Sequence, residues 1–199
     1  TQEKVIDYSV ILGVALLATS PMMQTYLYNG DDLCYHLARL EGLKDGILDG
    51  QIPVNILPDG LRGNGYLNAM YPYLFLYIGA FLRICRVSLA LSYKVIVFLA
   101  NLGSAVCAYA ALKSMIRSRR SVILAVVLYT LMPYRFTNIF SRGDLGETLA
   151  LVFWPLVIAG LYHVIMGERK KWYFLVIGFT GALQSHILSA AYVAAVCVV

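Results

Sequence analysis

Long apolar runs dominate this sequence and limit what it can fold into. Several runs approach the ~18–20 residues that an α-helix needs to cross a bilayer. Only 14% of the residues are charged and 60% are hydrophobic, whereas about a quarter are charged in an ordinary soluble domain. The sequence therefore predicts an all-α, multi-pass membrane protein. The expected spans are residues 5–28, 91–114, 121–138, 146–166 and 172–199.

The two ends of the chain indicate whether the sequence is expected to be part of a longer protein. The first apolar run extends past Ala18 and has no A-x-A exit, which indicates a retained span rather than a cleaved signal. The chain starts at Thr1 without a methionine and stops at Val199 inside an apolar run. We therefore expect residues 1–199 to be the N-terminal part of a single transmembrane domain of a longer protein.

Basic residues predict the orientation of the spans. The connectors 117–120 (RSRR) and 167–171 (GERKK) are rich in lysine and arginine and are separated by two spans. Because basic loops favour the cytoplasmic side, both connectors and the N-terminus are predicted to be cytoplasmic. This explains the net charge of +5 without a nucleic-acid partner. It also requires that residues 71–87, which carry Arg83 and Arg86, do not cross the membrane.

The predicted outer loop, residues 29–90, then contains two interfacial helices at about 31–48 and 71–87. In the first, Leu33, Leu37, Leu40 and Ile47 form an apolar stripe, and Asp32, His36 and Arg39 form a polar stripe beside it. One interpretation is an amphipathic helix on the outer membrane surface that presents an acid, an imidazole and a guanidinium together. The alternative is a surface helix with solvated polar pairs and Asp31 as its N-cap.

A second polar connector, residues 133–147, carries Arg135, Arg142, Asp144 and Glu147. Asp144 and Glu147 have the spacing of a capping box, which predicts a helix that begins at Leu145. The two arginines are expected at the membrane boundary, because an arginine at the membrane centre costs about 2.5–3.5 kcal/mol on insertion scales. There they could bind a phosphate beside the helix N-terminus, or simply extend to lipid headgroups.

Two further residues are candidates for substrate contact. Arg62 lies in a loop that is rich in turn signals, where it could touch a substrate or fold the loop onto the interface. His186 interrupts the last apolar run and is expected level with the other outer polar groups, as a substrate contact or as a helix-end histidine bonded to backbone. The cysteines Cys34, Cys85, Cys107 and Cys197 form no C-x-x-C pair, so we expect no disulfide framework or zinc site.

Several motifs in order resemble those of YfhO-like bacterial membrane proteins. These are GDDLCYHLARLEGLKDGILDGQIPV, LPDGLRGNGY, YPYLFLYIGAFLR, then YTLMPYRFTNIFSRGDLGETLALVFWPLVIAGLY and QSHILSA. YfhO-like proteins belong to the GT-C class of multi-span glycosyltransferases. The resemblance implies a GT-C-like helical bundle in the bacterial plasma membrane. It also implies transfer of a sugar from a polyprenyl-phosphate carrier to a glycan, lipid or polymer acceptor on the extracytoplasmic side.

The resemblance also implies roles for individual residues. Asp32 would act as general base, His36 would orient the acid or contact the acceptor, and Arg142 with Arg135 would hold the lipid phosphate. Glu147 matches the glutamate of the second outer loop. Arg39, Arg62 and His186 complete the predicted substrate-binding set.

One departure from the family pattern leaves the reactive acid open. Asp31 stands where a histidine is expected. Either Asp31 or Asp32 could therefore be the reactive acid, or both could bind a divalent cation such as Mg²⁺ or Mn²⁺.

The rival interpretation is a transporter or flippase that moves lipid-linked saccharides without transfer chemistry. Such a protein should place charged groups near the membrane midplane and break its helices there. A scaffolding protein should instead leave Asp32, His36 and Arg142 scattered. The polar clusters of this sequence gather at one predicted boundary, which favours the enzyme.

Overall fold

Four membrane-length helices organise the chain. The computed structural model describes residues 2–57, 66–67 and 71–198. Within these residues, 4 helices are long and apolar enough to cross a membrane. The chain is therefore an all-α, multi-pass membrane protein. The four are α1 (Gln2–Thr19) with the 3₁₀ turn η1 (Ser20–Met23), α4 (Leu89–Met115), the composite helix Arg119–Arg142, and α7 (Leu145–Ile165).

Shorter elements fill the connections between these helices. The segment after η1 leads to α2 (Leu33–Leu48), a two-residue antiparallel pair of β1 (Ile56–Leu57) and β2 (Tyr66–Leu67), and α3 (Leu76–Ile84). After α7 come the 3₁₀ turn η4 (Arg169–Lys171), α8 (Tyr173–Leu183) and α9 (Ile187–Val198).

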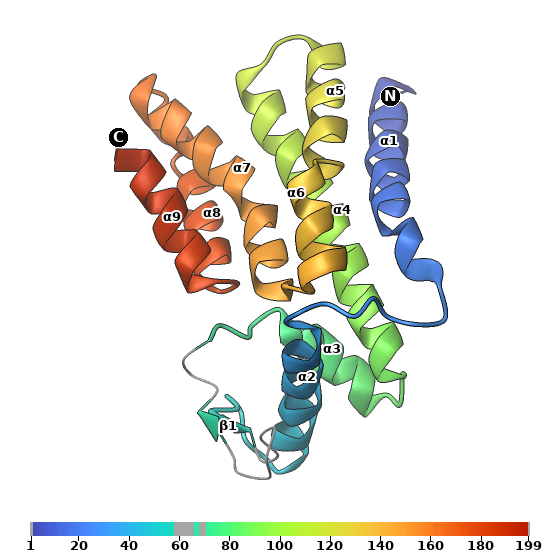
Figure 1. Ribbon diagram of the computed structural model, residues 1–199. Coiled ribbons are helices and arrows are strands. Elements are labelled where there is room, and N and C mark those ends of the chain that lie inside the picture. The colour runs from blue at the N-terminus through green and yellow to red at the C-terminus, as the bar shows by residue number, and fades with distance from the viewer. Residues whose placement is uncertain (1, 58–65, 68–70, 199) are drawn as a thin grey trace.

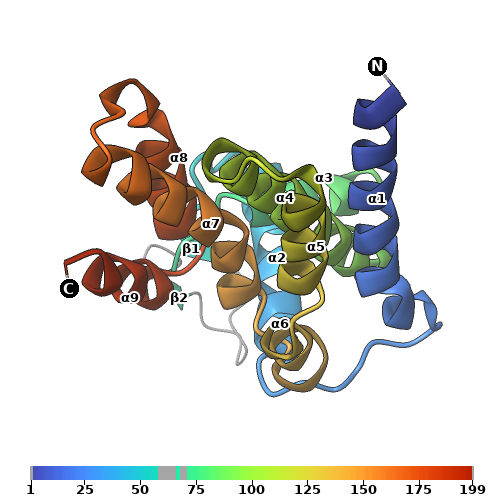
Figure 2. The same cartoon turned by 90° about the horizontal axis from the view of Figure 1, so that it is seen from above.

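The two ends of the bundle differ in character. The N-terminus and the α4–α5 and α7–α8 connections lie at one end, the basic end, and α2 and α3 lie beyond the opposite end, the loop end (Figure 1). Viewed from above, α1 stands at one side of α4 and α5, and α7 to α9 stand at the other (Figure 2). Residues 71–87 form no spanning helix, because α3 has only 9 residues and packs against α2 and α4 at the loop end.

The predicted span 121–138 is interrupted in the structure. It consists of α5 (Arg119–Thr130), α6 (Pro133–Phe136) and the π-helix η3 (Thr137–Arg142). Pro133 occupies the first turn of α6, where its missing N–H needs no partner. The proline thus explains why α5 ends at Thr130 and a new helical segment begins. The first predicted span also differs, because its helical part ends at Met23 rather than at residue 28.

The predicted single span 172–199 is wrong. The structure divides it into α8 and α9, which have 11 and 12 residues. At ~1.5 Å per residue α8 is about 17 Å long, too short for a hydrocarbon core of about 30 Å. The polar Gln184–Ser185–His186 sequence ends α8, and the chain turns back so that α9 runs antiparallel to α8 beside α7 (Figure 1).

Glycines allow α7 and α8 to pack at close range. A Cβ atom at Gly160 would lie 2.3 Å from the Leu175 backbone nitrogen, and one at Gly178 would lie 2.6 Å from the Val157 backbone nitrogen. Small residues at helix interfaces let the backbones approach closely, which is the main source of helix association inside a bilayer. The α7–α8 pair therefore depends on these two positions lacking a side chain.

We predict that Gly160→Ala destabilises the protein by about 1–3 kcal/mol, because the added methyl group must displace the α8 backbone. Gly13→Ala is the matched control, since no atom lies within 4 Å of a Cβ built there. Alanine is also the better helix former by roughly 1 kcal/mol. Thermal unfolding of the detergent-purified full-length protein measures both. Equal midpoints for the two variants would contradict the packing described here.

Candidate functional site

Two loops meet at the loop end of the bundle. The Asp32 backbone N–H, at the start of α2, donates a hydrogen bond of 2.8 Å to the carbonyl oxygen of Arg142. A Cβ atom at Gly30 would lie 2.6 Å from the Gly143 nitrogen, and one at Gly143 would lie 3.0 Å from the Leu33 Cβ. Gly143 has a φ of 67°, which favours glycine. The G-D-D and R-G-D sequences thus dock backbone against backbone.

Asp144 caps the N-terminus of α7 as the sequence predicts, but the capping box is not completed, because the Asp144 N–H donates to the Asn138 carbonyl oxygen. The Glu147 backbone N–H donates to Asp144 Oδ1 at 2.9 Å. Arg142 spans the same turn: its Nη2 donates to Asp144 Oδ2 at 3.0 Å, and its Nη1 donates to Glu147 Oε2 at 2.7 Å and Asn138 Oδ1 at 2.8 Å. Tyr134 Oη donates to the other Glu147 carboxylate oxygen. Two carboxylates therefore compensate the charge of Arg142.

His36 is buried behind this turn. Its side chain is 2% exposed, and its Nε2 lies 4.0 Å from Asp144 Oδ1. Burial is the main cause that lowers the His36 pKa from 6.5 to about 3, with smaller effects from the charges of Arg39 and His186. Burial also raises the pKa of Asp144. His36 is therefore a neutral imidazole at neutral pH and cannot supply a positive charge to a substrate.

Arg39 is also buried, at 1% exposure. Its Nη2 donates to the carbonyl oxygens of Tyr71 and Pro72, both at 3.0 Å, and its guanidinium carbon lies 4.4 Å from the centre of the Tyr71 ring. The expectation of an outward polar face with Arg39 on a substrate is thus wrong. The polar stripe of α2 instead faces the segment at residues 71–72 and the start of α7. The role of Arg39 is therefore to hold the backbone of residues 71–72 in place.

Arg135 lies inside the bundle rather than beside Arg142. Its side chain is 1% exposed. Its Nη2 donates to Asn101 Oδ1 at 2.9 Å, and Asn101 Nδ2 donates to Thr19 Oγ1 at 3.0 Å. The expectation that Arg135 contacts a phosphate or a lipid headgroup is therefore wrong, because the helix that restarts at Pro133 turns Arg135 toward α4. Its Nε and Nη1 have no hydrogen-bond partner in the described part of the chain.

His186 caps α9 and lines a groove. Its Nδ1 accepts a hydrogen bond of 3.3 Å from the Ser189 backbone N–H, and its ring lies 5.5 Å from that of Tyr71. The groove has a volume of about 560 Å³, and the Trp154 and Tyr192 rings stack along it at 5.9 Å. Its lining residues are Tyr134, Arg142, Glu147, Trp154, His186, Leu188, Ser189 and Tyr192.

The two candidate acids lie at the docked loop. Asp31 is exposed and Asp32 is half-buried. Asp32, not Asp31, is the N-cap position of α2, and its side chain makes no capping hydrogen bond. Within the described residues, neither carboxylate has a hydrogen bond or an ion pair, and no three potential metal ligands form a group. The donor set therefore does not fit a cation site built from protein ligands alone. Arg62 lies outside the described residues.

The sequence did not single out Tyr71, although it lies at the centre of this site. Its ring contacts those of Tyr35 and His36, each at 5.9 Å between ring centres. A Cβ atom at Gly146 would lie 1.9 Å from Tyr71 Oη, so α7 accepts the phenol only because position 146 is glycine. Burial raises the Tyr71 pKa well above its ordinary value. The Tyr-Pro pair and the glycine in D-L-G-E were the available signals.

The chain is similar to an uncharacterized protein of Lactococcus lactis subsp. cremoris (strain MG1363), with 27% identity over 180 residues. The match covers 88% of this chain but 29% of that protein, so the chain spans less than a third of its relative's length. No family model matches the chain. No solved structure matches it either. The family and activity expected from the resemblance therefore remain predictions.

We predict that His36 makes stability fall as the pH is lowered from about 6.5. Between that value and a folded-state pKa of about 3, the unfolded chain binds a proton that the folded chain rejects. At pH 5 the loss is about 2 kcal/mol. Thermal unfolding of wild type and His36→Gln across pH 7.5 to 5 measures it. The variant should lose less stability over this range, and parallel curves would contradict the prediction.

Proposed function

We propose that this chain is part of a membrane glycosyltransferase of the GT-C type. It would transfer a sugar from a polyprenyl-phosphate carrier to a cell-envelope acceptor at the outer face of the bacterial plasma membrane. The resemblance to YfhO-like proteins supports the class. The convergence of three separate segments at the loop end supports a site, because a scaffold has no reason to gather Asp32 and His36 with Arg142 and His186.

The position of Asp32 carries the proposal. Its backbone is fixed to the Arg142 carbonyl oxygen at 2.8 Å, while its carboxylate has no partner among the described residues and is half-exposed. A general base needs this combination of a fixed position and a free, accessible oxygen. Asp144, in contrast, is 4% exposed and bound to the α7 cap and to Arg142. Asp32 is therefore the better candidate for the reactive acid.

The transfer would be a single displacement. Asp32 takes the proton of an acceptor hydroxyl as that oxygen attacks the anomeric carbon of the sugar. The bond between the anomeric carbon and the phosphate oxygen breaks, and the polyprenyl phosphate leaves with the bonding electrons. Arg142 and the N-terminus of α7 lie where a leaving phosphate would gain from positive potential.

The surroundings of Arg142 constrain how it would act. Because Asp144 and Glu147 already bind the guanidinium, an incoming phosphate would have to share it or replace one carboxylate. The side chain of Arg142 is 39% exposed and lines the 560 Å³ groove. Trp154 also lines the groove, but its Nε1 is buried and has no hydrogen-bond partner in the described part of the chain. We assign no step to a metal ion.

His36 would have a positioning role. With a pKa of about 3 it is too weak a base to remove a hydroxyl proton at neutral pH. Its ring lies near both Asp144 and Tyr71, so it would hold the start of α2 in position against the start of α7. Of the two roles that the resemblance implies for His36, we therefore keep the orienting one, because a side chain that is 2% exposed has little surface for an acceptor.

A second candidate function is transport of lipid-linked saccharides. Two observations favour it: the interruption of the helix Arg119–Arg142 after Thr130, and the buried charge of Arg135 inside the bundle. Broken helices and internal charges are typical of transporters. The absence of a partner for the Asp32 carboxylate among the described residues has no explanation in a transporter, which makes this the weaker candidate.

We predict that Asp32→Asn lowers sugar transfer by about 10²–10⁴-fold, the usual contribution of a general base. The assay uses bacterial membranes that contain the full-length protein and a radiolabelled polyprenyl-phosphate sugar. Asp31→Asn should retain activity. Asp49→Asn is a matched control, because this exposed acid lies at the opposite end of α2.

Each outcome of this assay separates the candidates. If Asp31→Asn rather than Asp32→Asn abolishes transfer, the reactive acid is misassigned but the enzyme stands. If wild type transfers sugar and both variants match it, the acids have no catalytic role. If wild type moves the labelled lipid between leaflets without transferring its sugar, the transporter replaces the enzyme.

A further inference from the structure

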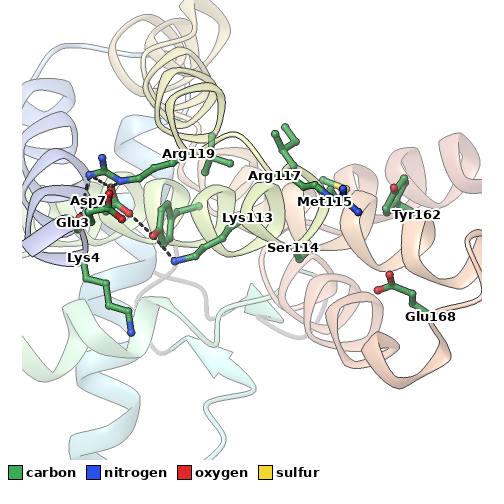
Figure 3. Close-up of a pocket in the computed structure, with 13 residues that line it drawn as sticks. Glu3, Lys4, Asp7, Lys113, Ser114, Met115, Arg117, Arg119, Tyr162 and Glu168 are labelled. Atoms are coloured by element: carbon green, nitrogen blue, oxygen red, sulfur yellow. Dashed lines mark hydrogen bonds and ion pairs between the residues drawn. The ribbon is translucent and has the colours of Figure 1, made fainter. Parts of the chain in front are cut away.

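A second cavity lies at the basic end of the bundle, away from the site at the loop end. It has a volume of about 610 Å³ and is lined by the ends of α1, α4, α5 and α7 (Figure 3). This volume lies within the ~300–1,000 Å³ of pockets that hold small ligands. Charged side chains dominate its lining, and some of these charges have partners within the protein.

Two of the acids in the cavity are compensated by the protein itself. Asp7 accepts hydrogen bonds from Arg119 Nε at 2.8 Å and from Tyr109 Oη at 2.7 Å, as Figure 3 shows. Glu168 lies 2.7 Å from Lys171 Nζ and 3.1 Å from His163 Nδ1. Neither carboxylate is therefore available to neutralise the remaining cations of the cavity.

Three cations remain. Lys113 Nζ donates to Tyr109 Oη at 2.8 Å, and this partner is a neutral phenol. Lys4 and Arg117 have no hydrogen bond or ion pair from their side chains to any described residue, and both are exposed. Glu3 is the one acid of the cavity lining that forms no ion pair with another described side chain. The cavity thus has an excess of positive charge.

The surroundings of the cavity indicate where an anionic ligand comes from. On α1, next to Lys4, the side chains of Val5 and Ile6 are 63% and 54% exposed. At the end of α7, Ile165 and Met166 are 72% and 61% exposed. Exposed apolar side chains on a spanning helix contact acyl chains. A phosphate at the level of Lys113 and Arg117 therefore lies where lipid headgroups lie.

We propose that this cavity binds the headgroup of an anionic phospholipid. Lys113, Arg117 and Lys4 line the cavity and supply the positive charge that attracts its phosphate. The bound lipid links α1 to α4 and α7 at the edge of the bundle. In the same region, the ion pair between Asp7 and Arg119 joins α1 to α5. The proposal is independent of glycosyl transfer, because the cavity is lined by residues of the basic end, whereas Asp32 lies at the start of α2 at the loop end.

The test uses the full-length protein in nanodiscs of phosphatidylcholine, with and without phosphatidylglycerol. Phosphatidylglycerol should raise the unfolding temperature of wild type, because a ligand that binds the folded state stabilises it. The double variant Lys113→Gln/Arg117→Gln should lose this shift. Arg120→Gln/Lys170→Gln is the matched control, because both cations are exposed at the basic end and neither lines the cavity. This control should keep the shift.

Three results would overturn the proposal. Wild type could unfold at the same temperature in both lipids, or both double variants could lose the shift equally, which would indicate diffuse surface charge. Inorganic phosphate added to the detergent-purified protein could also reproduce the whole shift, and the ligand would then be a free anion. If the Lys113→Gln/Arg117→Gln variant fails to fold in phosphatidylcholine, Arg117→Gln alone replaces it, since Arg117 is exposed.

Discussion

The contact between the loop at Gly30–Leu33 and the turn at Arg142–Gly143 organises the loop end of this protein. It consists of one backbone hydrogen bond, from Asp32 to Arg142, and a close approach that only glycine permits at positions 30 and 143. Through it, the start of α2 is fixed to the N-terminus of α7. The burial of His36 and Arg39 and the position of Tyr71 follow from that attachment.

The two ends of the bundle differ in which charged side chains have partners. At the loop end, Arg142 is enclosed by two carboxylates and the capping network of α7, and His36 is kept neutral by burial. Among the described residues there, Asp31 and Asp32 are acids without a hydrogen bond or an ion pair. At the basic end the acids Asp7 and Glu168 are compensated, and the cations Lys4, Lys113 and Arg117 outnumber the remaining acid, Glu3. An acid without a partner at the loop end suits the removal of a proton from an acceptor hydroxyl. An excess of cations at the basic end suits the binding of a lipid phosphate.

Inside the bundle, Arg135 belongs to a chain of side-chain hydrogen bonds that joins several helices. Its bond to Asn101 joins α6 to α4, and the bond from Asn101 to Thr19 extends the chain to α1. A buried guanidinium with unpartnered nitrogens within the described residues is costly in a low-dielectric interior. The contact between α7 and α8 is of a different kind, because it is apolar. Glycines let the two backbones pack closely, and this packing holds the helices together.

The sequence by itself determined that this chain is a multi-pass helical membrane protein, where its long helices α4 and α7 lie, and that Asp144 caps α7. These follow from local rules: the length of apolar runs and the side chain–backbone geometry of a helix N-terminus. Only the tertiary structure decided that α8 and α9 fold back on each other and that Arg135 points to Asn101. It also decided that His36 and Arg39 face inward to Tyr71. The physical reason is that these features depend on contacts between residues far apart in sequence. Periodicity shows only that a stripe of a helix is polar. It does not show whether that stripe faces water or another buried polar group.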